Sequence, residues 1–345
     1  MGSMPKADHP SGRLKMLVLT ASIFFVFSST MLGVQSQSAS PTNKLDVAVQ
    51  LIKREKFEEA TKLLKEIVKD NETDANAWFY LGFAYAHSNE VKKAITALET
   101  SIKLDPGWSS AHVTLSDMLL QQGKREIALA EIEKALSLQP QDPYAHYLHS
   151  LISLLMNSKD EAVRHADLAV QLRPDFAQAH LLKAQALLGF YLDAGDAQDE
   201  TAKTIFMARY KGASDPLTKY VRLTSDSENR RVWVDEIEVL TGSSAGGKQV
   251  VLTGKDVATK ARLTSKPEPT YTETARRYKV EGTVILKAVF DGGGNVSRIF
   301  IVNALPCGLT EQAVKAAHKI KFIPATLDNK PVSMWIQLEY NFHLY

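Results

Sequence analysis

The sequence predicts a multi-domain protein, an all-α helical repeat solenoid followed by a small α+β domain. Three observations support this prediction. Small and apolar residues recur every 34 residues in the middle of the chain, residues 332–344 alternate apolar and polar without a break, and an uncharged segment lies near the N-terminus. A period of 34 with helical patterning indicates stacked helix pairs, and a period of two indicates a β-strand. The length of 345 residues leaves room for two or three such domains.

The N-terminal segment Met16–Val34 carries no charge and follows three basic residues. As a helix it would be about 28 Å long, close to the apolar thickness of a bilayer. The basic flank predicts that everything after the segment lies outside the cytoplasm. Two interpretations of residues 1–38 stay open, a signal peptide cleaved before Ala39 or a transmembrane anchor formed by residues 16–34.

The repeat region covers residues 41–241. Alanine and proline each keep the 34-residue step, at Ala94, Ala128, Ala162, Pro106, Pro140 and Pro174. The unit containing Trp78, Leu81, Gly82 and Tyr85 resembles the tetratricopeptide (TPR) consensus. We expect three full repeats between degenerate end units, with a last helix over 227–241. The TPR resemblance implies a protein-binding module.

The first helix of each repeat is expected to line the concave face of this solenoid. The register assigns to that face Asn76, Phe79, Phe83, Val113, Asp117, Leu120, Tyr144, Tyr147 and Leu151. The resulting groove would be mainly aromatic and aliphatic, which favours an apolar or amphipathic segment of a second protein or peptide as its guest. The alternative for each single residue is packing against a neighbouring helix.

Three histidines, His146, His149 and His165, fall on one predicted helix pair. They raise the question of a metal site, because imidazole is a common metal ligand. His112, His146 and His180 nevertheless occupy the position that Trp78 holds in its own repeat. Position in the array explains them, and we expect no metal site.

A linker is predicted over residues 242–264, and the second domain over residues 265–345. Its expected order is helix, two strands, helix and long strand. The first helix follows a capping box that begins at Thr270, and the second has Thr310 as its N-cap. The other elements are two strands, 283–290 and 296–302, joined by a glycine-rich turn, and the alternating segment 332–344.

This second domain resembles the C-terminal domain of TonB-type energy transducers. The matching features, in order, are Pro267–Tyr271, Glu281–Val284, the Asp291 turn, Gly308–Glu311, Phe322–Ala325, Lys330–Val332 and the closing aromatic strand. The resemblance implies an antiparallel three-stranded sheet with two helices. It also implies a periplasmic domain that adds an extended peptide of an outer-membrane receptor as a strand. The partner-binding edge is expected to involve Ser333, Trp335, Ile336, Gln337, Glu339 and Asn341. The alternative is that the last strand belongs only to the core, with its edge covered by a helix or by a second copy of the domain.

The sequence therefore predicts a cell-envelope protein of a Gram-negative-type bacterium, coupling to outer-membrane receptors in transmembrane transport. In the resembled family, an anchor histidine couples the protein to a proton-driven inner-membrane complex, and a proline-rich spacer follows. Residues 16–34 contain no histidine, and the following stretch is not rich in proline. The alternative is a periplasmic TPR scaffold for protein assembly with no energy coupling.

Several function classes are disfavoured by the sequence. A net charge of +2 without a basic cluster argues against nucleic-acid binding. The single cysteine, Cys307, cannot form an internal disulfide. No nucleophile elbow, phosphate-binding loop or HExxH motif occurs, so we expect no enzyme, no catalytic residue and no cofactor.

Overall fold

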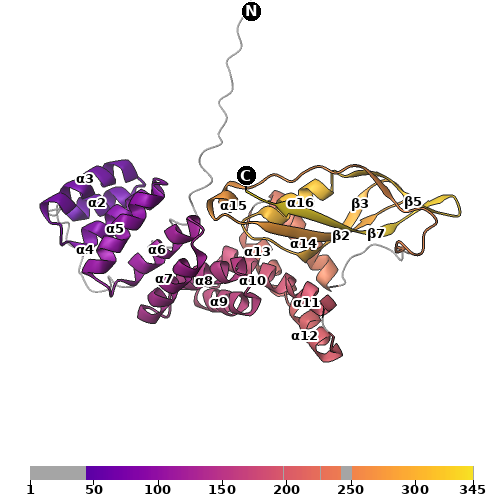
Figure 1. Cartoon of the computed structure of the whole chain (residues 1–345), viewed down its shortest axis with the longest axis horizontal. Coiled ribbons are helices and arrows are strands. Elements are labelled where there is room, and N and C mark those ends of the chain that lie inside the picture. Colours follow the sequence, from indigo (N-terminus) through magenta and orange to yellow (C-terminus); the bar gives the residue numbers. More distant parts are fainter. Residues whose placement is uncertain (1–43, 197, 226, 242–250, 345) are drawn as a thin grey trace, which may run out of the picture.

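A computed structural model describes residues 44–196, 198–225, 227–241 and 251–344. The predicted signal peptide or anchor, and most of the glycine-rich part of the predicted linker, lie outside these residues. Within them, none of the helices has a stretch long and apolar enough to cross a membrane. The predicted order of a helical solenoid followed by a small α+β domain is confirmed (Figure 1).

The solenoid begins with four helix pairs. Their bounds are α2 Lys44–Lys53, α3 Phe57–Asp70, α4 Ala75–His87, α5 Val91–Leu104, α6 Ser109–Gln121, α7 Arg125–Leu138, α8 Pro143–Leu155 and α9 Lys159–Leu172. Asp74 and Asp142 cap α4 and α8 by accepting hydrogen bonds from first-turn amides. The prolines of the 34-residue series, Pro106, Pro140 and Pro174, follow α5, α7 and α9, since a residue without an N–H cannot continue a helix.

The two helices of a pair approach closely at one repeated position. A Cβ on Gly82 would lie 2.7 Å from Leu98 Cγ, so this position in α4 admits no larger side chain without movement of Leu98. Two repeats carry serine at the same position, Ser116 and Ser150. Their hydroxyls donate to the carbonyls of Ala128 and Ala162, at 2.6 and 2.7 Å. The small residues that mark the period are therefore the contact points between paired helices.

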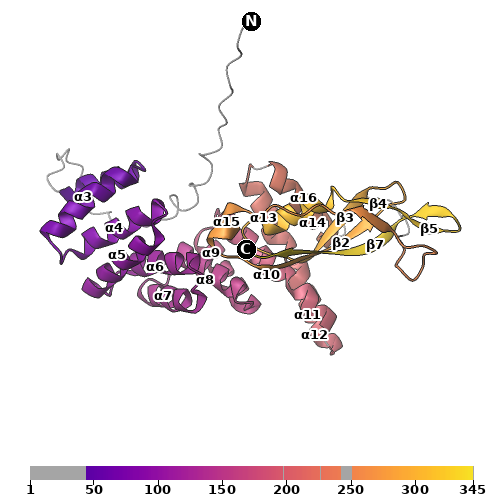
Figure 2. The same cartoon turned by 45° about the horizontal axis from the view of Figure 1, so that its top comes forward.

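The solenoid ends in five further helices, α10 Ala177–Leu188, α11 Phe190–Asp196, α12 Glu200–Lys211, α13 Ser214–Leu223 and α14 Ser227–Thr241. Helices α11 and α12 contact Phe300 of the sheet through Tyr191 and Tyr210, and their connected ends project away from it (Figure 2). Helix α14 packs against both the sheet and a helix of the second domain. Its Trp233 is fully buried.

The second domain contains two helices and seven strands in the described residues. The bounds are β1 Arg262–Ser265, α15 Glu273–Arg277, β2 Gly282–Phe290, β3 Val296–Asn303, α16 Leu309–Ala317, β4 Lys321–Ile323, β5 Ala325–Leu327, β6 Lys330–Val332 and β7 Met334–Phe342. The main sheet has the order β3-β2-β7 and is antiparallel, as predicted. The small β1–β4 and β5–β6 sheets were not predicted, because strands of three or four residues are too short to show a period of two.

Both predicted helix caps of this domain are wrong. Thr272, not Thr270, caps α15 by accepting from the amide of Ala275. Gly308 is the N-cap residue of α16, with φ 84°, a left-handed value that favours glycine. The Thr310 hydroxyl instead bonds to both main-chain groups of Leu305, at 2.8 and 2.9 Å. Thr272 and Thr274 flank the start of α15, and Gly308 and Thr310 flank the start of α16, so the sequence alone does not select the cap.

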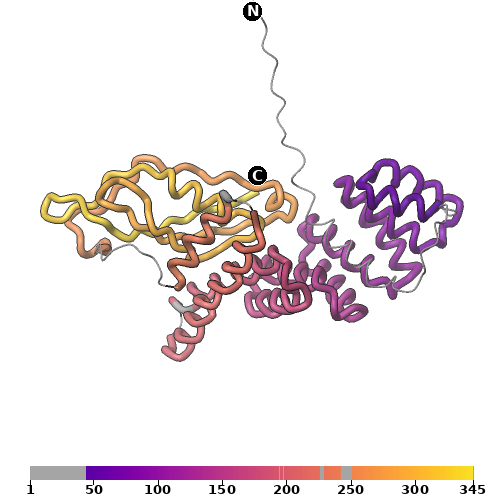
Figure 3. Tube along the Cα trace, turned by 180° about the vertical axis from the view of Figure 1, so that it is seen from behind, coloured from indigo at the N-terminus to yellow at the C-terminus, as the bar shows by residue number. Residues whose placement is uncertain are grey.

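The second domain lies against the solenoid along α6–α14, and α2–α5 extend away from it (Figures 1 and 3). Buried polar contacts join the two parts. Glu236 of α14 accepts a hydrogen bond from the amide of Ile301 in β3 at 2.9 Å. Trp233 donates to Glu311 of α16 at 3.0 Å. These contacts hold the second domain on helix α14 of the solenoid.

Candidate peptide-binding edge and solenoid groove

Strand β7 has one buried and one exposed face, as its alternating sequence predicted. Leu338, Tyr340 and Phe342 are buried, and Glu339 and Asn341 between them are exposed. The strand pairs with β2 along its whole length, from Gly282↔Phe342 to Phe290↔Met334. Because β7 is last in the order β3-β2-β7, its other side is the edge of the main sheet.

The contacts on this outer edge show which main-chain groups face away from β2. The amide of Trp335 donates to the carbonyl of Leu252 at 3.0 Å, and the amide of Leu252 donates to the carbonyl of Ser333 at 2.9 Å. Lys266 Nζ donates to the carbonyl of Glu339 at 2.6 Å. Main-chain groups alternate in direction along an antiparallel strand. Residues 335, 337, 339 and 341 therefore face outward, and residues 336, 338 and 340 face β2.

The six residues predicted for the edge fall into three groups. Ser333 and Trp335 already pair with Leu252 through one outward group each. Ile336 turns its main chain toward its partner Ala288 in β2. Gln337, Glu339 and Asn341 also face outward, and the outward carbonyl of Glu339 accepts a hydrogen bond from the Lys266 side chain. Among the described residues, no strand pairs with β7 on this side beyond the isolated bridge to Leu252.

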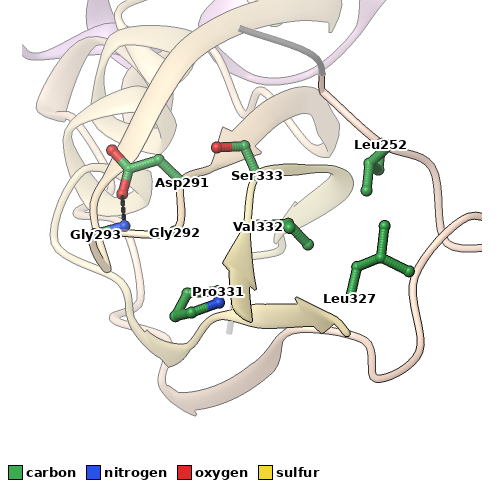
Figure 4. Close-up of a pocket in the computed structure, with 8 residues that line it drawn as sticks. All are labelled: Leu252, Asp291, Gly292, Gly293, Leu327, Pro331, Val332 and Ser333. Carbon is green, nitrogen blue, oxygen red and sulfur yellow. Dashed lines mark hydrogen bonds between the residues drawn. The ribbon is translucent and has the colours of Figure 1, made fainter. Parts of the chain in front are cut away.

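A cavity of about 560 Å³ adjoins the bridged end of β7. Leu252, Leu327 and Val332 point toward one another on one side of it, and the β2–β3 turn forms the other side (Figure 4). In that turn, Asp291 Oδ1 accepts from the amides of Gly293 and Asn295 at 2.9 and 2.8 Å. The glycine-rich segment is thus a hairpin turn, as predicted.

The solenoid groove is contacted by the chain's own second domain. The Tyr278 hydroxyl, just after α15, donates to Asp117 Oδ1 of α6 at 2.9 Å. Next to it, Lys279 Nζ donates to the carbonyl of Gln122 at 2.7 Å, and Arg125 donates to the carbonyl of Lys279 at 3.2 Å. The predicted groove residue Asp117 therefore already has an intramolecular partner.

The remaining predicted groove residues are mostly covered. Asn76 is exposed and Tyr147 is half-buried. The others are at most 6 % exposed, namely Phe79, Phe83, Val113, Leu120, Tyr144 and Leu151. Phe79 packs on Trp108, with ring centroids 4.3 Å apart, and Tyr147 packs on Phe176 at 5.0 Å. Packing between neighbouring helices accounts for much of this aromatic surface.

Two buried carboxyl groups mark the interface between solenoid and sheet. Burial raises the pKa of Asp117 to about 6, although the Tyr278 hydroxyl opposes the shift. Burial likewise raises the pKa of Glu236 to about 8, against hydrogen bonds from Ile301 and Tyr210. Burial also raises the pKa of Cys307 to about 12, so its thiol stays protonated and unreactive near neutral pH.

The residues that hold the domains together follow no pattern that assigns them this role. Trp233 and Glu236 fall within the helix predicted over 227–241, and Tyr278 ends the short helix predicted after Thr270. A glutamate on the buried side of the apolar α14 stripe was the one available signal, because a buried carboxyl needs a partner.

The histidines have the repeated structural role that their spacing suggested. The side-chain nitrogens of Trp78, His112, His146 and His180 each lie 2.8–3.2 Å from the carbonyl six residues upstream. In the part of the chain that the structure describes, no group of three or more His, Cys, Asp or Glu residues could hold a metal ion.

Comparison with protein families gives two matches. Residues 267–344 match the family described as Gram-negative bacterial TonB protein C-terminal. Residues 43–166 match a family described as Domain of unknown function (DUF7017). Tetratricopeptide repeat domain-containing protein PYG7, chloroplastic, from Arabidopsis thaliana is 28 % identical over 101 residues, which cover 28 % of this chain. The matched region spans 33 % of that relative, about a third of its length.

Solved structures with similarity to the chain are helical repeat proteins. A crystal structure of MamA is 19 % identical and has a TM-score of 0.43, covering 51 % of this chain and 98 % of MamA. YrrB, titled a TPR protein with an unusual peptide-binding site, is 16 % identical with a TM-score of 0.42, covering 55 % and 88 %. Scores of this size carry no argument beyond the repeats already seen. The chain thus combines TPR-like helical repeats with a TonB-type C-terminal domain, and both are protein-interaction modules.

Proposed function

We propose that this chain is a non-enzymatic envelope protein, a TonB-like transducer that couples to an outer-membrane receptor in transmembrane transport. The receptor contributes an extended peptide, which adds as a strand to the outer edge of β7. One observation carries the proposal. The edge from Gln337 to Asn341 faces outward beside no other strand in the described part of the chain. Unpaired strand edges bind extended peptides through main-chain hydrogen bonds.

The solenoid has two roles in this proposal. The part from α6 to α14 holds the second domain through Asp117, Trp233 and Glu236, which leaves β7 at the rim. Its N-terminal half, α2–α5, lies away from the second domain and is the part proposed to dock a second protein (Figure 1).

The alternative function is a periplasmic scaffold for protein assembly that makes no use of the proton gradient. The absence of histidine in residues 16–34 favours it, because the resembled transducers couple through such a residue. Sequencing the N-terminus of the mature protein separates the two. A start near Ala39 supports the free scaffold, and an intact residue 16–34 segment supports an anchored transducer.

The strand-addition proposal is tested by removing one outward main-chain donor from the edge. Gln337→Pro deletes an N–H that faces away from β2, and proline is tolerated at such positions of edge strands. We expect the variant to fold and to lose at least tenfold of its capture of outer-membrane receptors from envelope extracts. Gln337→Ala, which keeps the N–H, is the matched control and should capture normally. Ile336→Pro is unsuitable, since it removes a donor to β2 and disrupts the sheet. Undiminished capture by a folded Gln337→Pro variant contradicts the proposal.

A further inference from the structure

We propose that Lys266 makes the outer edge of β7 selective for an extended peptide carrying a carboxylate side chain. The inference rests on the proposed function and specifies the chemistry of its partner. Lys266 lies directly after β1, and its ammonium donates a hydrogen bond to the carbonyl of Glu339 at 2.6 Å. Its Nζ also lies 4.6 Å from the centre of the Tyr340 ring. The Lys266 ammonium thus occupies the carbonyl at the centre of Gln337–Asn341, the stretch to which a partner strand must bond.

The bridge at Leu252 shows a direction in which a strand can lie along this edge. Leu252 pairs with Met334 in the parallel sense, with hydrogen bonds to the residues on either side of Met334. A peptide that continues this direction and register places residues beside Ile336, Leu338 and Tyr340 in turn. The residue beside Tyr340 donates its N–H to the carbonyl of Glu339. Entry of the peptide therefore displaces the Lys266 ammonium from that carbonyl.

The displaced ammonium has a defined neighbour. In a parallel pair, the residue beside Tyr340 directs its side chain to the same face of the sheet as the Tyr340 ring. Lys266 lies over that ring, so its ammonium is next to the incoming side chain. A carboxylate at this position replaces the lost bond to Glu339 with a charge-assisted hydrogen bond. A neutral side chain leaves the displacement uncompensated.

The opposite face disfavours an acidic side chain. There the edge presents Gln337 and Glu339, whose side chains hydrogen-bond to each other at 2.9 Å. The Glu339 carboxylate repels a second carboxylate on that face. Burial raises the pKa of Tyr340 to about 12 and the nearby Glu268 adds to the shift, so Glu268 is close enough to weaken the attraction exerted by Lys266. The preference for a carboxylate is thus confined to the Tyr340 face, and Glu268 reduces its strength.

The Tyr340 hydroxyl provides an independent observation at the same place. Tyr340 is 1 % exposed, and its hydroxyl oxygen has no hydrogen-bond partner among the described residues. A buried hydroxyl without a partner destabilises the arrangement that encloses it. Lys266 lies over the ring of this tyrosine, so a partner that displaces the lysine also changes the surroundings of this hydroxyl.

The test uses two blocked synthetic peptides, Val-Thr-Val-Thr-Glu-Thr-Val and the same sequence with Gln in place of Glu. In both, the variable residue lies on the same face as the valines. Binding of each labelled peptide to the full chain is measured by fluorescence anisotropy. We expect the Glu peptide to bind roughly fivefold more tightly than the Gln peptide. Lys266→Met should reduce this ratio to about one and should tighten binding of the Gln peptide.

Two further variants sharpen the result. Lys260→Met removes an exposed lysine from the same segment and should leave the ratio unchanged. Glu268→Gln should increase the ratio. Equal binding of the two peptides, or a ratio that survives Lys266→Met, overturns the role of Lys266 and leaves strand addition intact. If neither peptide binds, or if Gln337→Pro fails to weaken binding, the proposed function is contradicted, and the inference that rests on it falls as well.

Discussion

His146, His149 and His165 form a buried cluster between α8 and α9 in which all three rings are neutral. Arg164 donates to His165 Nε2 at 2.6 Å, so the proton of His165 is on Nδ1. That nitrogen lies 2.9 Å from His146 Nδ1, and His146 Nε2 donates to the carbonyl of Pro140 at 3.0 Å. His149 stacks on His165 with ring centroids 3.5 Å apart. These hydrogen bonds are all made only when each imidazole ring is neutral and carries a single N–H.

This cluster makes the solenoid sensitive to acid. Burial lowers the pKa of His149 to about 4 and that of His165 to about 3, with Arg164 adding to both shifts. An unfolded chain protonates histidine near pH 6.5, so the unfolded state binds more protons below that pH. The stability contributed by neutral histidine is present above pH 6.5 and is lost as pH falls toward 4. The wild-type protein should lose free energy of unfolding between pH 7 and pH 5. We expect His149→Gln to reduce this loss by about 2 kcal/mol, measured by urea unfolding at the two pH values.

The control for the histidine experiment is His343→Gln, because His343 is exposed near the end of the chain. This variant should keep the full acid sensitivity of the wild-type protein. The same sensitivity in His149→Gln would show that the cluster does not cause it.

At the scale of elements, β7 combines a correct prediction with a partial one. The period of two predicted the strand and its buried face, because thirteen alternating residues leave few other interpretations. Side-chain alternation does not reveal which main-chain groups face a neighbouring strand, so Ile336 was placed on the edge together with Gln337. That distinction depends on the pairing with β2 and on the contacts of Leu252 and Lys266, which come from elsewhere in the sequence.

The Tyr340 hydroxyl gives a stability prediction with an unusual sign. Because this buried hydroxyl has no partner in the described residues, Tyr340→Phe should stabilise the fold by about 1 kcal/mol in chemical denaturation. Tyr278→Phe, the same substitution at a tyrosine bonded to Asp117, should destabilise it by about 1–3 kcal/mol. Destabilisation by Tyr340→Phe would mean that this hydroxyl makes a bond in solution.

At the scale of the whole molecule, the two domain types and their order were predictable, and their contact was not. Repeats and strands each follow a local period that one sequence displays. The docking of the sheet uses Asp117, Glu236 and Tyr278, which are far apart in the chain and belong to no common pattern. A groove assigned to a foreign guest proved to be contacted in part by the protein's own second domain.

The docking predicts that the two parts stay together without a covalent connection. A specific protease site inserted between Gly246 and Gly247, followed by cleavage, should leave both fragments in one peak on size exclusion. Phe300→Ala removes a ring that packs edge-on against Tyr191 and Tyr210, at 5.1 and 5.9 Å. We expect this variant to weaken reassociation by about 2 kcal/mol, roughly thirtyfold.

The control for this experiment is Ile205→Ala, which changes a half-exposed residue on α12. Its cleaved fragments should behave as those of the unmodified chain. Two separate peaks from the unmodified chain after cleavage would show that the contacts seen here do not hold the domains together.

The contact between Tyr278 and Asp117 also limits how the groove can be used in living cells. Because Tyr278 and Asp117 belong to one chain, their contact does not depend on the protein concentration. A second ligand that binds near α6 must therefore displace Tyr278, whose contact with Asp117 does not weaken when the protein is diluted. A second ligand binds there only at high concentration or with high affinity, and its binding breaks the Tyr278–Asp117 contact while Trp233 and Glu236 still hold the second domain.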